Sequence, residues 1–175
     1  MAHPIDEATA KTAGAVRAVK SRFKGLVGVF TTLAKEHGEV KHLLKRAMNT
    51  SDTDKQRELW PMLRAELLSH ERAELIEVYP AMDTHPELTA MVARHRKEAR
   101  DFEIALDGVD TASYGTNDWT RALGTLEAIV TEHARVEEED FFPRASAAME
   151  KQVIEALARR YQTRKAAIMA ELGAV

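Results

Sequence analysis

A histidine followed four residues later by a glutamate, and then by an aromatic-proline pair, occurs twice in this 175-residue chain. The first pair is His70 and Glu74, the second is His133 and Glu137, and in both a proline lies six residues after the glutamate and follows an aromatic residue. Residues four apart lie on one face of an α-helix, so each pair can direct an imidazole and a carboxylate at one point. Such side chains hold metal ions in the core of helical bundles. The spacing therefore predicts a metal site inside a bundle.

Apolar residues recur at alternating steps of three and four, which is typical of bundle helices. They predict four main helices, over about residues 21–48, 53–79, 84–106 and 117–142. A helical arm is expected over 5–20 and an amphipathic helix over 149–172, packed outside the bundle or on a second copy. No segment alternates with the period of two that strands show. The sequence therefore predicts an all-α domain over residues 1–175, with its bundle core at about 21–148.

Each main helix places a histidine on its apolar stripe, and two of them also place a glutamate there: His37, His70, Glu74, His95, His133 and Glu137. One core histidine is more often a satisfied core residue than a ligand. Several imidazoles with two buried carboxylates are different, because an unpaired buried carboxylate costs several kcal/mol. A bound cation resolves that cost. Imidazole and carboxylate suit iron, manganese or zinc, and two shared carboxylates fit a dinuclear site.

Composition excludes several classes of function. The net charge is −3 with no basic block, so nucleic acid is not an expected partner. No apolar run is long enough for a membrane span, and the first residues do not read as a signal peptide, so a cytoplasmic location is expected. The chain has no cysteine, which rules out disulfides, thiolate ligands and thiol nucleophiles.

The pattern resembles the hemerythrin-like family, also called HHE cation-binding domains, over about residues 30–143. The resemblance rests on the six stripe residues and on Pro80 and Pro143. It implies an up-down-up-down four-helix bundle that holds two non-haem iron ions bridged by oxo or hydroxo, and the amphipathic segment over 149–172 adds a C-terminal helix to that bundle. It also implies that His37 and His70 bind one iron and that His95 and His133 bind the other. Glu74 and Glu137 would bridge the pair.

Two positions depart from the oxygen-carrying members of that family. Those proteins have a second histidine four residues after the third-helix histidine, where this chain has Ala99. Glu98, Glu71 or water would then fill the position. Glu71 resembles part of the His-Glu-x-x-Glu arrangement in the iron-sensing hemerythrin-like domain of an F-box ubiquitin-ligase subunit, and is otherwise an exposed helix glutamate. Fewer protein ligands favour sensing or reactivity over dedicated oxygen carriage.

Three functions stay open on the sequence alone. The first is a di-iron protein that binds oxygen, peroxide or nitric oxide for sensing, storage or stress response. The second is an enzyme that decomposes peroxide or oxidises ferrous iron, and the third is an interaction module with a redox-silent metal. The protein would be a monomer or a homodimer through the C-terminal helix. Glu36 and His42 flank His37 and are expected to be solvated, whereas Tyr79 either closes the bundle end or approaches the metal.

Overall fold

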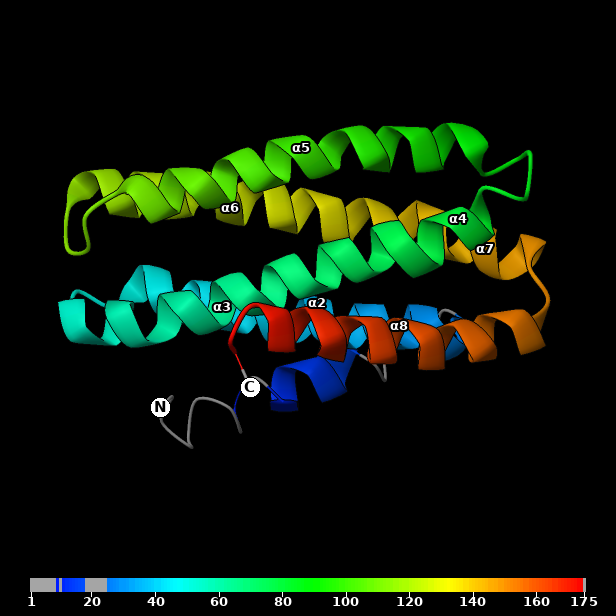
Figure 1. Cartoon of the computed structure of the whole chain (residues 1–175), viewed down its shortest axis with the longest axis horizontal. Coiled ribbons are helices and arrows are strands. Elements are labelled where there is room, and N and C mark those ends of the chain that lie inside the picture. The colour runs from blue at the N-terminus through cyan, green and yellow to red at the C-terminus, as the bar shows by residue number, and fades with distance from the viewer. Residues whose placement is uncertain (1–8, 10, 18–24, 175) are drawn as a thin grey trace.

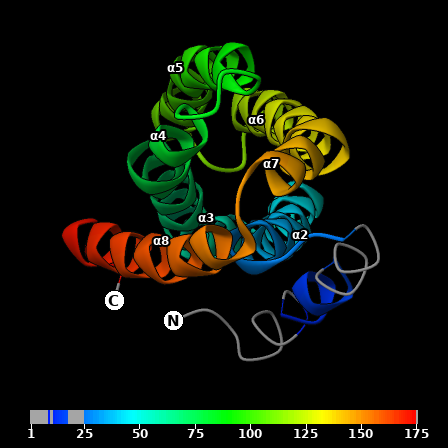
Figure 2. The ribbon, with the colours of Figure 1, turned by 90° about the vertical axis from the view of Figure 1, so that its right-hand side faces the viewer.

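Four long antiparallel helices form a bundle, and a fifth covers one of its faces (Figures 1 and 2). The computed structural model describes residues 9, 11–17 and 25–174, which hold helices and turns but no strand. The bundle helices are α2 (Gly28–Asn49), α3 (Thr53–Ala73), α5 (Thr89–Thr111) and α6 (Asn117–Val136). The outer helix is α8 (Lys151–Glu171), which packs on α2 and α3. The prediction of an all-α bundle with an extra C-terminal helix is confirmed.

Helix ends follow the local sequence at most junctions. Asp52 accepts hydrogen bonds from two backbone N–H groups at the start of α3, and Thr116 accepts one at the start of α6. Such side-chain caps satisfy N–H groups that have no partner within the helix. The third helix is the exception, because residues 83–88 form turns and the Thr84 hydroxyl donates to the Ala81 carbonyl instead of capping α5. The predicted start at Thr84 is therefore wrong.

The third helix also continues beyond its predicted end near residue 106 to Thr111. Val109 is buried and extends the apolar stripe by one more step of three after Leu106. Gly108 lies inside this extension, and a Cβ added to it would have no neighbour within 4 Å.

Both helices that carry a His-x-x-x-Glu pair continue through their proline by means of a π-helical turn. The turns are η1 (Glu74–Val78) and η2 (Glu137–Phe141), followed by α4 (Tyr79–Met82) and α7 (Phe142–Ala148). The N–H of the residue before each proline bonds to the glutamate carbonyl five residues back. Proline has no N–H and crowds the carbonyl four residues back, and the wider turn accommodates it. The second helix, predicted to end near residue 79, therefore continues through Pro80 to Met82 by a local widening that begins at Glu74. The second copy widens in the same way from Glu137.

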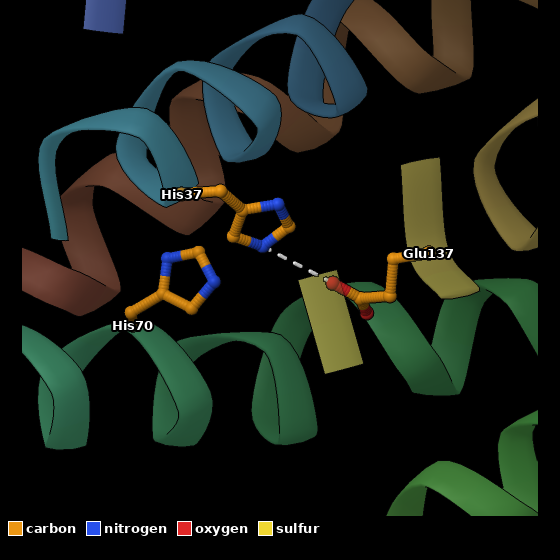
Figure 3. Close-up of side chains that lie close together, drawn as sticks. All are labelled: His37, His70 and Glu137. Atoms are coloured by element: carbon orange, nitrogen blue, oxygen red, sulfur yellow. Dashed lines mark ion pairs between the residues drawn. The ribbon is translucent and has the colours of Figure 1, made fainter. Parts of the chain in front are cut away.

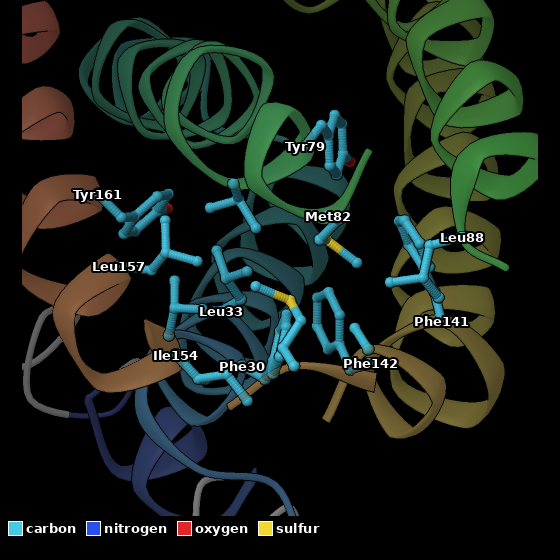
Figure 4. Close-up of a cluster of buried hydrophobic side chains, with 14 of the residues drawn as sticks. Phe30, Leu33, Tyr79, Met82, Leu88, Phe141, Phe142, Ile154, Leu157 and Tyr161 are labelled. Carbon is cyan, nitrogen blue, oxygen red and sulfur yellow. The ribbon is translucent and has the colours of Figure 1, made fainter. Parts of the chain in front are cut away.

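Two apolar clusters fill the bundle, and the candidate ligands lie between them along each helix. The first, shown in Figure 4, includes Phe30, Leu33, Met82, Phe142 and Leu157. The second includes Leu44, Trp60, Phe102, Leu106 and Leu126. On α2, for example, His37 lies between Leu33 of the first cluster and Leu44 of the second. The polar residues are therefore shielded by apolar layers above and below.

Segments from both ends of the chain pack on the bundle. A helical segment, residues 11–17, approaches α2 closely at Gly38, where an added Cβ would lie 3.0 Å from the Ala13 carbonyl oxygen. The rest of the expected arm over 5–20, and the expected start of the first helix at Ser21, lie outside the described residues. Residues 25–27 are described and are not helical, so the prediction that the first helix covers them is wrong and α2 begins at Gly28. The apolar side of α8 is buried on its own chain through Ile154, Leu157 and Tyr161. Among the described helices none is long and apolar enough to cross a membrane.

Candidate metal centre

One half of the candidate centre is formed by His37, His70 and Glu137, which are all buried (Figure 3). The Nε2 atom of His37 lies 3.2 Å from Glu137 Oε2, and His70 Nε2 lies 3.3 Å from Glu74 Oε2. The side chains come from α2, α3 and the start of η2. One ligand atom from each of His37, His70 and Glu137 falls within 4.8 Å of the others, which is the spacing that a single cation needs.

The other half is centred on His133 of α6. Its Nε2 atom lies 3.3 Å from Glu137 Oε2, the same oxygen that approaches His37. Glu71 and Glu74 form one ligand group with His133, and His95 and Glu98 form another. Because Glu74 also approaches His70, Glu74 and Glu137 each reach toward both halves. The structure thus brings all six stripe residues into one polar layer.

The donor atoms in this layer are buried and have no hydrogen-bond partner among the described residues. They are His37 Nε2, His70 Nε2, both ring nitrogens of His95, His133 Nε2, both Glu74 oxygens, Glu137 Oε2 and Glu71 Oε1. Buried polar groups are nearly always satisfied, because each orphan costs about 1–3 kcal/mol. A concentration of such atoms on imidazole and carboxylate groups fits a bound cation.

Two further carboxylates contact the Nδ1 atoms of His37 and His70, which are the ring nitrogens that face away from the centre. Glu36 Oε2 lies 3.0 Å from His70 Nδ1, and Glu138 Oε1 lies 2.9 Å from His37 Nδ1. A carboxylate accepts hydrogen bonds, so the imidazole must donate from Nδ1, which leaves the Nε2 lone pair facing the centre. Glu36 and Glu138 are called the outer carboxylates below. This arrangement fixes the tautomer that a metal ligand requires.

The outer carboxylates are themselves paired with cations from the two ends of the chain. Glu36 accepts hydrogen bonds from Tyr161 (2.6 Å) and Lys165 (2.8 Å) of α8. Glu138 accepts one from Arg17 at 2.6 Å. The expectation that Glu36 is solvated is wrong: Glu36 is 7 % exposed, because α8 covers the side of α2 on which it lies. The residues next to Glu36 in the sequence do not predict that α8 packs over it.

The layer carries an excess of negative charge in the absence of a cation. Burial, together with the charges of Glu137 and Glu71, raises the pKa of Glu74 well above its usual value. Burial likewise raises the pKa of Glu71 to about 7. Burial alone would lower the pKa of His133, but the carboxylate of Glu137 raises it to about 9. A divalent cation would replace these protons as the balancing charge.

Tyr79 and Glu71 lie closer to the centre than the sequence indicated. The Tyr79 hydroxyl is fully buried and donates to Glu137 Oε1 at 3.0 Å, so this residue orients a candidate bridging carboxylate. Glu71 is 4 % exposed, and its Oε2 lies 3.7 Å from His133 Nε2. The interpretation of Glu71 as an exposed helix glutamate is therefore wrong. Glu98 leans toward the centre, with Oε2 3.5 Å from His95 Nδ1, while Arg94 binds its other oxygen.

Two spaces adjoin the ligand layer. A cavity of about 20 Å³ borders His37, His70 and His133 and is walled by Val40, Leu67, Phe102 and Val130. A larger pocket of about 360 Å³ opens between α5 and α6, lined by Glu71, Glu98, Ala99 and His133 among others. The small alanine side chain helps to leave this second space open. The first can hold one water-sized molecule, and the second connects the His133 half with the surface.

A family model described as "Hemerythrin HHE cation binding domain" matches residues 28–145 of the chain. The matched part contains all six stripe residues and both π-helical turns, whereas residues 11–17 and α8 lie outside it. Comparison with curated proteins gives no match, and comparison with solved structures gives none either.

Proposed function

Because the chain belongs to the hemerythrin HHE cation-binding domain family, we propose that it is a non-haem di-iron protein that binds or reacts with dioxygen, peroxide or nitric oxide. Its role would be sensing, storage or the response to oxidative or nitrosative stress. The observation that carries the proposal is that imidazoles from α2, α3, α5 and α6 and carboxylates from α3, η1 and η2 bring together buried donor atoms that have no hydrogen-bond partner in the part of the chain that the structure describes. Iron, when bound, would supply the redox and Lewis-acid chemistry.

The ligand assignment follows the geometry of the layer. His37 and His70 would hold one iron, and His95 and His133 the other. Glu137 Oε2 lies 3.2 Å from a nitrogen of one pair and 3.3 Å from a nitrogen of the other, which supports a bridging role. Glu74 lies near His70 and shares a ligand group with His133, which supports the same role. Glu71 and Glu98 are the carboxylates available to the second iron beside Ala99.

The surroundings of the layer suit a small ligand. The 20 Å³ cavity is lined by three ligand histidines, by Glu71 and by apolar side chains, and it has room for one small molecule. Tyr79 holds Glu137 in place, and the apolar clusters on both sides exclude bulk water. The residues of this chain thus fix the ligands and restrict access.

The proposal is tested by loading the protein with ferrous iron without oxygen, then measuring the metal content and the optical spectrum before and after oxygen is admitted. We expect about two irons per chain and new charge-transfer absorption. His95→Gln should lower the iron content, whereas His85→Gln, a control outside the layer, should not. A protein that stays colourless and metal-free after loading would refute the proposal, and a preference for zinc with no redox response would favour the structural module.

The 360 Å³ pocket beside Ala99 favours an enzymatic variant of the same function as a second candidate. A molecule larger than dioxygen can reach the His133 half through it. The reactions that fit are peroxide decomposition, in which two peroxides give two waters and one dioxygen, and ferrous-iron oxidation, in which dioxygen or peroxide accepts the electrons. Oxygen evolution from peroxide by the iron-loaded protein, compared with the same amount of free iron, decides this candidate.

A further inference from the structure

The two halves of the centre have different surroundings, and we propose that they hold metal unequally. The half at His37 and His70 is the retained position, fastened by the outer carboxylates and the cations behind them. The half at His95 and His133 is the exchange position, loaded and emptied through the pocket between α5 and α6. The inference rests on the proposed dinuclear site and adds that its two positions release metal at different rates.

The retained half is tied to both ends of the chain. His37 is held by Glu138 and Arg17, and His70 by Glu36 with Tyr161 and Lys165. A partner on the outer nitrogen orients an imidazole and increases its basicity, which strengthens metal binding. Each outer carboxylate has its own cation, so its charge is balanced without drawing on the metal. Movement of either imidazole would break a chain of short, mostly buried contacts.

The exchange half lacks this support. Both ring nitrogens of His95 are buried without a hydrogen-bond partner among the described residues. The nearest carboxylate, Glu98, is 3.5 Å from His95 Nδ1, and its other oxygen binds Arg94 on the surface. The His133 side chain is 15 % exposed, compared with 5 % for that of His37. This imidazole pair is therefore less firmly held, and its exposed member is His133, because the His95 side chain is only 1 % exposed.

The pocket gives the exchange half a route to the surface that suits a cation. It is lined by His133, Ala99, the buried Glu71 and Glu98, whose side chain is 35 % exposed. Glu71 is nine-tenths buried, lines the pocket and keeps Oε1 without a hydrogen-bond partner among the described residues. A ferrous ion that enters from the α5–α6 side would meet carboxylate oxygens before the imidazoles. The larger pocket is not lined by His37 or His70.

The test measures iron release from the whole protein. Chain loaded with ferrous iron without oxygen is mixed with excess ferrous chelator, and the coloured chelate is followed in time. We expect two phases, each of about one iron per chain. Glu36→Gln and Glu138→Gln should speed the slow phase by roughly 10–100-fold and leave the fast phase unchanged. Ile129→Trp, which places a ring in the pocket, should slow the fast phase alone.

Matched controls separate this effect from general destabilisation. Glu66 also binds Lys165, at 2.8 Å, and Glu139 binds Arg135, also at 2.8 Å, yet neither has an ion pair or hydrogen bond with a ligand histidine. Glu66→Gln and Glu139→Gln should therefore leave both phases unchanged. If Glu36→Gln does not fold, Lys165→Met, which removes the cation only, should still speed the slow phase, and Lys165→Arg should restore it.

Three outcomes would overturn the inference. Release of both irons in one phase would show equivalent positions, as would equal acceleration of both phases by Glu36→Gln. Equal effects of the control variants would assign the change to general loosening. These results leave the proposed function intact, since the protein would still hold two irons, whereas fewer than two irons per chain would overturn both.

Discussion

Replacing Glu74 by glutamine should change stability in opposite directions with and without metal. Glu74 is fully buried and neither of its oxygens has a hydrogen-bond partner among the described residues. Burial, then Glu137 and Glu71, raise its pKa well above the usual value of 4.5. In the metal-free protein this carboxyl group is therefore a source of instability.

The sign and size of the effect follow from that pKa shift. A carboxyl group whose pKa is raised by folding contributes nothing below about pH 4.5, where it is protonated in both states. At higher pH the unfolded chain ionises first, so the folded state is penalised. Glu74→Gln removes the penalty, and we expect the metal-free variant to gain about 1–3 kcal/mol of unfolding free energy at pH 8. The gain should disappear toward pH 4.5.

The iron-loaded protein should respond in the other way. Loss of a bridging carboxylate weakens metal binding, and each tenfold loss of affinity removes about 1.4 kcal/mol of the stabilisation that bound iron provides. Chemical denaturation of both forms at pH 5 and pH 8, with iron analysis, measures the effect. Glu77→Gln is the control on the same π turn, because Glu77 is paired with Arg160 and Arg164. It should cost about 1 kcal/mol in both forms and leave the iron content unchanged.

A structural role for Glu74 would give a different result. If the carboxylate served mainly to hold His70, the metal-free Glu74→Gln variant would lose about 1 kcal/mol of unfolding free energy at pH 8, as the control does, instead of gaining stability. That outcome, or an iron content equal to that of the wild type, would refute the assignment of Glu74 as a metal ligand.

Three further changes test other parts of the structure. Ala99→His places an imidazole one turn after His95 in the pocket. It should slow the fast phase of iron release by about tenfold or more, because a residue that binds the metal directly affects affinity more than a residue that only orients a ligand. Gly28→Ala should lower the unfolding free energy by about 1–3 kcal/mol, since Gly28 has φ +53° and an added Cβ would lie 2.6 Å from the Ile154 carbonyl oxygen. Gly108→Ala, with open space around it, should instead raise the unfolding free energy by about 0.5–1 kcal/mol. In the metal-free protein, Glu137 overcomes the effect of burial and raises the pKa of His133 from 6.5 to about 9, so the stabilisation that His133 provides is full below pH 6.5 and is lost as the pH rises through 9. Denaturation of the metal-free and iron-loaded forms across that range checks this, because a metal-bound imidazole does not titrate there.

The sequence predicted those parts of the centre that depend on spacing along one helix. His70 and Glu74 are four residues apart, so one helical face suffices to place them together. His37 and His95 could be found because each continues an apolar stripe in steps of three and four. The π-helical turns could not be predicted from the periodicity of the apolar residues. Each turn begins at the last ligand of its helix, so its extra residue shifts the apolar stripe only beyond the ligands. Proline at a fixed distance after both glutamates was the available signal.

The outer carboxylates were missed for a different reason. Glu36 is adjacent to a stripe position, and its neighbours alone predict a solvated side chain. It is buried because Tyr161 and Lys165 lie 125 and 129 residues further along the chain, on a helix whose docking site the sequence does not specify. Glu138 is similar, because Arg17 is 121 residues away. Contacts of this kind depend on tertiary packing, which local patterns do not encode.

The position of these contacts suggests how the centre tolerates so many acidic groups. The matched family region, residues 28–145, contains both outer carboxylates, but Arg17 and Lys165 lie outside it. Without these cations Glu36 and Glu138 would add negative charge beside Glu74 and Glu137. These ion pairs neutralise Glu36 and Glu138, so the two carboxylates can orient His37 and His70 without needing a metal ion to balance their own charge. Among residues 9, 11–17 and 25–174, the carboxylate beside His95 is Glu98, which pairs with Arg94 at the surface. In our proposal the two ends of the chain therefore create the difference between the two positions.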